Sequence, residues 1–168
     1  MSLLDVATMK FTNGAQELTY ERVKDYLNSS PFQATVKASA EKPYFDLIYQ
    51  DATLIELYVL PWDTHPYPDM ELAIVRASSC VALGCGPELD LLRFLLDENR
   101  KMRFGSFQTD EAGTVFFANR ILGGQHMDPT ELEVCLLSVG AIATRYSDIL
   151  IDKFDGQRSL NVTPPLKL

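Results

Sequence analysis

The chain of 168 residues carries 23 acidic and 15 basic residues, a formal net charge of −8 at pH 7. Hydrophobic residues make up 46% and charged residues 23%, ordinary proportions for a globular protein, which excludes disordered and fibrous classes. The length suits one domain, and the negative charge argues against nucleic acid or an anionic membrane as partner, because phosphate groups repel an acidic surface.

The cysteines and the first residues indicate a compartment. Cys80, Cys85 and Cys135 are too few, and odd in number, for a disulfide framework. Residues 1–5 show no basic segment followed by a long apolar run, so no signal peptide is expected. No apolar stretch approaches the about 20 residues that a membrane span needs. We therefore expect a cytoplasmic protein without a membrane partner.

The first predicted element is a helix that begins at Tyr20 with Thr19 as its cap and ends before Pro31. The apolar period then changes from 3.6 to 2, and segments 44–49 and 53–60 predict a hairpin around Asp51. In the second arm, one set of alternate residues is purely apolar and predicts the core face: Ile55, Leu57 and Val59.

A stiff loop with three prolines follows at 61–68, and then a strand at 72–83. Pro87 suits the first position of the next helix, whose end is crowded by basic residues at 100, 101 and 103. Segments 104–109 and 114–121 predict a second hairpin. A long helix begins with Asp128 as cap and Pro129 at its first position, and Gly156 is its expected stop.

The strands come in runs and do not alternate with the helices. This order predicts an α+β fold with a mainly antiparallel sheet on which the helices pack: helix, strands, helix, hairpin, long helix. We expect one domain over residues 1–156 and a loose C-terminal tail over residues 157–168.

A search for chemistry finds no complete catalytic, cofactor or metal constellation. Cys80 and Cys85 lack further ligands at the spacing of a zinc site, and His65 and His126 are distant in sequence. The Gly84–Gly86 turn lacks the other residues of a phosphate loop. A triad around either histidine stays open, because its members need only be adjacent in space. We expect no catalytic residue, no cofactor and no metal.

Two groups of residues are candidates for binding a partner. Trp62 and Tyr67 lie on the proline-rich loop and offer aromatic anchors, although Trp62 could equally close the end of the sheet core. Asp148 and Asp152 share a face of the long helix, where like charges form either a solvated face or a contact surface for a basic partner.

The second half of the chain carries a family resemblance. It combines the run Leu-Leu-Arg-Phe-Leu at 91–95, Asn99, Phe-Gly-Ser-Phe at 104–107, Val-Phe-Phe-Ala at 115–118 and Tyr-Ser-Asp at 146–148. These motifs, over about residues 88–150, resemble the YbjN-type family, and the proportions are similar to short members found in cyanobacteria. The resemblance implies a type III secretion chaperone-like fold, in which proteins often dimerise and bind segments of other proteins.

Two residues of these motifs have a physical reading of their own. Because Gly105 has no side chain, it permits a close backbone approach or a bulge. Asn99 can cap the turn from the helix into the strand. Both roles concern folding.

The leading hypothesis is a non-enzymatic protein-interaction or chaperone-like module that binds a protein partner at sheet edges or in grooves beside the first helix, and that forms a homodimer. The alternative is a small-molecule-binding protein or an enzyme with a pocket near the 61–68 loop, formed by Trp62, His65 and Tyr67.

Overall fold

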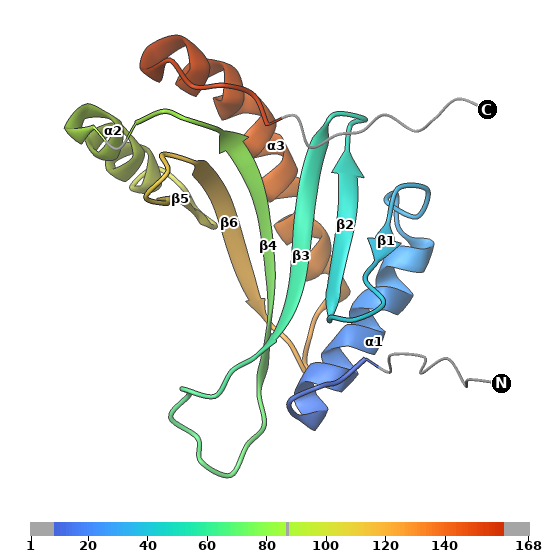
Figure 1. Ribbon diagram of the computed structural model, residues 1–168. Helices are drawn as coiled ribbons and strands as arrows, with labels where there is room; N and C mark the ends of the chain where they lie inside the picture. Colours follow the sequence, from blue (N-terminus) through green and yellow to red (C-terminus); the bar gives the residue numbers. More distant parts are fainter. Residues whose placement is uncertain (1–8, 87, 160–168) are drawn as a thin grey trace, which may run out of the picture.

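The computed structural model describes residues 9–86 and 88–159 and has the expected α+β architecture (Figure 1). Six strands form one antiparallel sheet in the order β1-β2-β3-β4-β6-β5. The predicted order of elements is confirmed: α1 (Gly14–Ser29), β1 (Lys37–Ala38), β2 (Tyr44–Tyr49), β3 (Thr53–Pro61), β4 (Ala73–Ala82), α2 (Leu89–Asn99), β5 (Ser106–Thr109), β6 (Val115–Leu122) and α3 (Pro129–Phe154).

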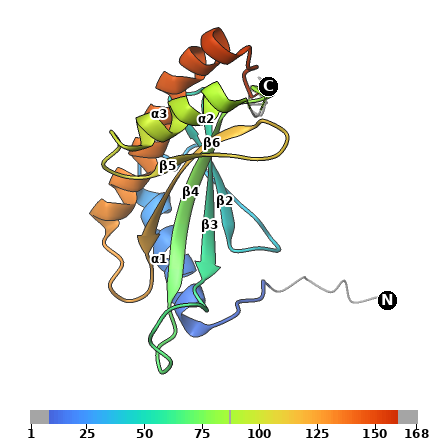
Figure 2. The ribbon, with the colours of Figure 1, turned by 90° about the vertical axis from the view of Figure 1, so that its left-hand side faces the viewer.

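The helices gather on one face of the sheet, as the side view shows (Figure 2). The alternation predicted for β3 is confirmed, because Ile55, Leu57 and Val59 are at most 1% exposed and point toward the helices. In register with Leu57 lie Phe45 on β2 and Ala77 on β4, so one continuous core fills the space between sheet and helices.

The helix α1 begins earlier than the sequence predicted. Its cap is Asn13, whose side chain accepts the N–H of Gln16, and the helix starts at Gly14 and not at Tyr20. Thr19 is fully buried inside the helix, where its hydroxyl donates to the carbonyl of Ala15 and accepts the N–H of Gly124. The expected Thr19 cap is therefore wrong, because this hydroxyl serves a tertiary contact.

The other helix ends follow the sequence signals in part. The helix α2 begins at Leu89 with Glu88 in the cap position; Pro87 lies outside the described residues. Asp128 caps α3 as predicted, by accepting the N–H of Thr130. At the other end, Asp155 adopts the left-handed conformation in place of Gly156. Gly156 is needed for space, since a Cβ there would lie 2.6 Å from the Cys85 sulfur.

The Phe-Gly-Ser-Phe segment enters β5 through a tight approach to β6. Gly105 has a φ of +70°, and a Cβ there would lie 2.7 Å from the carbonyl oxygen of Ala118. The next aromatic, Phe107, packs its ring edge-on against Phe117 at 5.0 Å between centroids. The close backbone approach expected at Gly105 is confirmed.

The helix α3 is long and apolar enough to span a membrane by length and composition alone. One side of it packs under the sheet along its whole length, with seven buried residues: Leu132, Cys135, Leu136, Val139, Gly140, Ala143 and Leu150. The apolar character of this side is that of a core helix.

Part of the expected tail is described. The N–H and C=O of Gln157 pair with Leu83 at 2.8 Å, and Arg158 forms an ion pair with Asp148. Residues 160–168 lie outside the described residues. The domain boundary at residue 156 stays a prediction.

Candidate functional site

The side of the sheet opposite the helices forms an open face, which no described helix covers (Figures 1 and 2). The register of β2, β3, β4 and β6 brings together on this face side chains from segments more than 70 residues apart. The open face is defined here by the outward residues of these strands: Tyr44, Asp46, Leu54, Glu56, Tyr58, Leu60, Ile74, Arg76, Ser78, Cys80, Phe116, Ala118, Arg120 and Leu122.

One end of the open face is apolar. Leu60, Ile74 and Leu122 are partners in register across three strands and form what we name the apolar row. Leu60 is 37% exposed and Leu122 is 46% exposed. Trp62 and Leu72 follow directly on this row, joined by a hydrogen bond from the Trp62 N–H to the Leu72 carbonyl at 2.9 Å. The apolar row therefore exposes apolar surface to water, and a partner could bury this surface.

Beside the apolar row lies a cluster of tyrosines and carboxylates. The rings of Tyr44 and Tyr58 are partners in register with centroids 4.7 Å apart. The Tyr44 hydroxyl donates to Asp46, and the Tyr58 hydroxyl donates to Glu56 at 3.2 Å. Burial raises the pKa of both tyrosines, and the neighbouring carboxylates raise it further. Both hydroxyls therefore remain protonated donors at neutral pH.

Next to this cluster, two arginines face each other across β4 and β6. Arg76 and Arg120 are partners in register, and like charges in such pairs are destabilising. Neither forms an ion pair with a residue in the described part of the chain. Among the described residues, the buried Nε of Arg76 has no hydrogen-bond acceptor.

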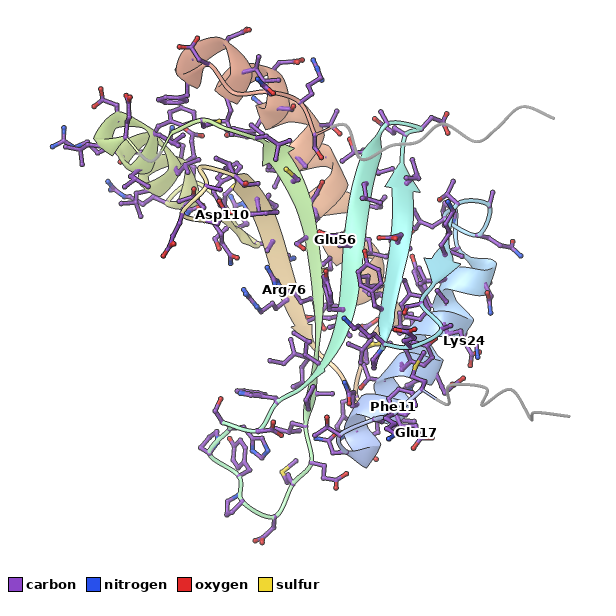
Figure 3. All side chains as sticks on the ribbon, in the orientation of Figure 1. Phe11, Glu17, Lys24, Glu56, Arg76 and Asp110 are labelled. Carbon is purple, nitrogen blue, oxygen red and sulfur yellow. The ribbon has the colours of Figure 1, made fainter. Side chains whose placement is uncertain are left out.

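The middle of the open face is hollowed into a shallow pocket of about 470 Å³. Glu56, Tyr58 and Arg76 form one wall, and Cys80 and Phe116 form another. Figure 3 shows Glu56 and Arg76 on the neighbouring strands that frame it. A smaller pocket of about 200 Å³ lies where the ends of β3 and β4 meet α3. Neither pocket is lined by a residue of the 61–68 loop.

At each side of the sheet, a side chain occupies the backbone groups of one residue. At the outer edge of β5, Asn99 accepts the N–H of Phe107 at 2.6 Å and donates to its carbonyl at 3.2 Å. At the other edge, the hydroxyl of Thr35 accepts the N–H of Ile48, and β1 covers β2 with only two residues. The capping role expected for Asn99 is confirmed, and a partner strand finds the Phe107 groups occupied.

Replacing Asn99 by alanine should lower the free energy of unfolding by about 1–3 kcal/mol, because it leaves the N–H and C=O of Phe107 without partners. Urea unfolding measures the loss. The control is Asp97→Ala at the same helix end, where the exposed ion pair with Arg100 is worth less than about 1 kcal/mol. Equal effects of the two substitutions would contradict the role of Asn99.

The four predicted partner-binding residues lie at opposite ends of the molecule (Figure 1). Trp62 and Tyr67 belong to the long β3–β4 loop, where His65 packs between them with ring centroids at 5.8 and 6.4 Å. Asp148 and Asp152 lie on the outer side of α3, and Asp148 is paired with Arg158. Trp62 and Tyr67 therefore share the loop, and Asp148 and Asp152 share the outer side of α3. The two pairs do not form one site.

The candidates for catalysis are separate in space or engaged elsewhere. The Nδ1 of His65 accepts the N–H of Tyr67, and the hydroxyl of Ser79 donates to the carbonyl of Leu54. The three cysteines are free, and burial raises the pKa of Cys135 to about 12. Within residues 9–86 and 88–159, no three His, Cys, Asp or Glu side chains gather as metal ligands would.

The described part of the chain is thus an α+β domain with its helices on one face of the sheet and a second, partly apolar face that no described helix covers. A family model described as "T3SS (YopN, CesT) and YbjN peptide-binding chaperone 1" matches residues 65–162, more than half of the chain. The chain belongs to this family, and the predicted resemblance is confirmed. A comparison with curated proteins found no match.

The residues of the open face were only partly visible in the sequence. Alternation in β3 places Leu60 away from the core, and Arg76 interrupts an apolar strand. The pairing of Arg76 with Arg120 depends on the β4–β6 register between segments separated by α2 and β5, which no local pattern encodes.

Proposed function

We propose that the open face binds an unfolded or partly folded segment of a partner protein, and that the chain acts as a chaperone-like binding module without catalysis. The observation that carries the proposal is the apolar row, which is exposed although it continues a sheet whose other face is fully buried. Membership of a peptide-binding chaperone family supports it.

Docking on the open face suits the chemistry of this surface better than strand addition. Strand addition would meet occupied backbone groups at Phe107 and Ile48, which Asn99 and Thr35 bind. The open face instead offers apolar side chains beside tyrosines and arginines, and tyrosine and arginine are enriched at protein interfaces. A bound segment would gain affinity by removing the apolar row from water.

The test is binding to an array of 12-residue peptides rich in apolar residues, followed by titration of the strongest binders with fluorescence anisotropy. Leu122→Asn should weaken binding at least about tenfold, equivalent to about 1.4 kcal/mol. The matched control is Leu96→Asn, since Leu96 is 65% exposed on α2, away from the open face. Equal affinities of both variants and the parent would overturn this site.

A homodimer is a separate part of the proposal. The outward side of α3 carries an exposed apolar stripe at helical spacing, formed by Val134, Leu137 and Ala141. A two-fold axis would let this stripe pack against its copy. Light scattering should then give twice the monomer mass for the parent and the monomer mass for Val134→Glu. A monomeric parent would overturn the dimer and leave the open-face site unaffected.

The alternative function, a small-molecule or catalytic site near the 61–68 loop, has less support. No residue of this loop lines either pocket, and Tyr67 is 57% exposed. The cytoplasmic location and the absence of catalysis, metal, cofactor and nucleic acid remain predictions.

A further inference from the structure

We propose that Arg76 and Arg120 together bind a side-chain carboxylate of the docked segment, so that the segments this protein selects carry an Asp or Glu next to a large apolar residue. The inference rests on the proposed function of the open face and specifies the chemistry of its partner. It follows from three observations on these two arginines.

The first observation is their position. Arg76 and Arg120 are partners in register on adjacent strands of the open face. Adjacent strands are about 4.8 Å apart, so a single carboxylate placed between the two guanidinium groups can contact both. It would turn a repulsive pair into two attractive contacts, and arginine is suited to carboxylates because its planar fork donates two parallel hydrogen bonds.

The second observation is the lack of an acceptor among the described residues. Within residues 9–86 and 88–159, the Nε of Arg76 is buried and has no hydrogen-bond partner. The nearby carboxylate of Glu56 accepts hydrogen bonds from Tyr58 and Tyr44 and forms no ion pair with Arg76. Since buried donors are nearly always satisfied in proteins, this Nε beside a pocket can take an acceptor from a ligand.

The third observation is the neighbouring apolar row. Ile74 precedes Arg76 by two residues, and Leu122 follows Arg120 by two residues. All four residues lie on the same face. Two residues of a strand span about 7 Å, which matches residues i and i+2 of an extended segment and, more loosely, i and i+4 of a helix. A segment with an acidic residue two positions from a large apolar residue can therefore engage both features at once.

The occupant is an acidic side chain and not a nucleic acid. Within the described ranges only two cationic groups meet here, and the carboxylates of Glu56 and Asp46 lie on β3 and β2 of the same face. A polyanion would place several phosphates against these carboxylates and against a chain of net charge −8. A single carboxylate reaches the arginines without approaching the acidic side of the face.

The experiment uses paired 12-residue peptides, amidated at the C-terminus, that differ only by Glu or Gln two positions from a central Leu. Fluorescence anisotropy at low and moderate salt gives the ratio of affinities for each pair. The parent should prefer the Glu peptide at least about tenfold, and this preference should shrink as salt rises. Arg120→Gln and Arg76→Gln should each bring the ratio close to one while affinity for the Gln peptide stays within about twofold of the parent.

Controls separate the outcomes. Arg93→Gln removes an exposed charge from α2, away from the open face, and should leave the Glu preference intact. Arg120 is exposed, so Arg120→Gln tests the site even where Arg76→Gln unfolds. Equal binding of Glu and Gln peptides by the parent would overturn this inference and leave the open-face site standing. Binding of neither peptide, together with an unresponsive peptide array, would overturn the proposed function as well.

Discussion

Phe117→Ala should lower the free energy of unfolding by about 3–5 kcal/mol, a large part of the total stability of a domain of this size. Phe117 is fully buried at the centre of β6 and packs edge-on against Phe107. Alanine would remove the ring and leave a cavity that the surrounding sheet and helices cannot fill, because strand backbones are held in place by their pairing. Urea unfolding followed by circular dichroism measures the loss.

The matched control is Phe116→Ala, the same substitution one residue earlier in the same strand. Phe116 points to the open face and is half-buried, so its removal should cost no more than about half as much as that of Phe117. Because side chains of a strand alternate between faces, equal losses would mean that β6 pairs in a register shifted by one residue. The comparison therefore tests the register from which the open face is built.

An element of the fold could be predicted from the sequence where a single short pattern determines that element. The alternation of a purely apolar set, Ile55, Leu57 and Val59, with a mixed set predicted the core face of β3, and Asp128 followed by Pro129 predicted the start of α3. The start of α1 was missed because only Thr19 was considered as its cap. Asn13 and Thr19 are both good caps, and only the tertiary contact of Thr19 with Gly124 decides between them.

The candidate site was less accessible, for a physical reason. Exposed aromatic and acidic residues such as Tyr67 and Asp152 stand out in a sequence because each is unusual where it occurs. The open face consists of residues that are unremarkable singly, such as Leu122 and Arg120, and that become a surface only through cross-strand register. Register follows from the whole set of turns and buried faces, so a site of this kind requires the sheet to be known first.

The same limit applies to the sheet edges. Asn99 was expected to cap the turn from the helix into the strand, and its side chain binds the N–H and C=O of Phe107 across that turn. The consequence for function was not visible, because only the topology shows that β5 is an edge strand. A closed edge shifts the expected mode of partner binding from strand addition toward the open face.

Gly105→Ala should lower the free energy of unfolding by about 2–4 kcal/mol, more than an alanine substitution at an ordinary loop position. The φ of +70° strains any residue with a side chain, at a cost of about 1–3 kcal/mol. In addition, the new Cβ would lie 2.7 Å from the carbonyl oxygen of Ala118 and 2.8 Å from the ring of Phe117, so β5 and β6 would have to separate. Gly84→Ala is the control, since Gly84 has a similar φ of +65° with no atom within 4 Å of its Cβ, and it isolates the strain from the clash.

A double-mutant cycle then measures how much of the destabilisation by the Gly105→Ala clash comes from the Phe117 ring and how much from the Ala118 carbonyl. In Gly105→Ala/Phe117→Ala the ring is absent, so the double variant should be more stable than the sum of the single losses predicts, with a coupling of about 0.5–3 kcal/mol. The contact with the Ala118 carbonyl remains, so part of the Gly105 loss should persist. Additive losses would show that the ring moves aside freely and that the backbone approach alone requires glycine. Both results would explain why a glycine lies between two phenylalanines at the start of β5. The close approach of β5 to β6 at Gly105 allows the Phe107 and Phe117 rings to be in contact.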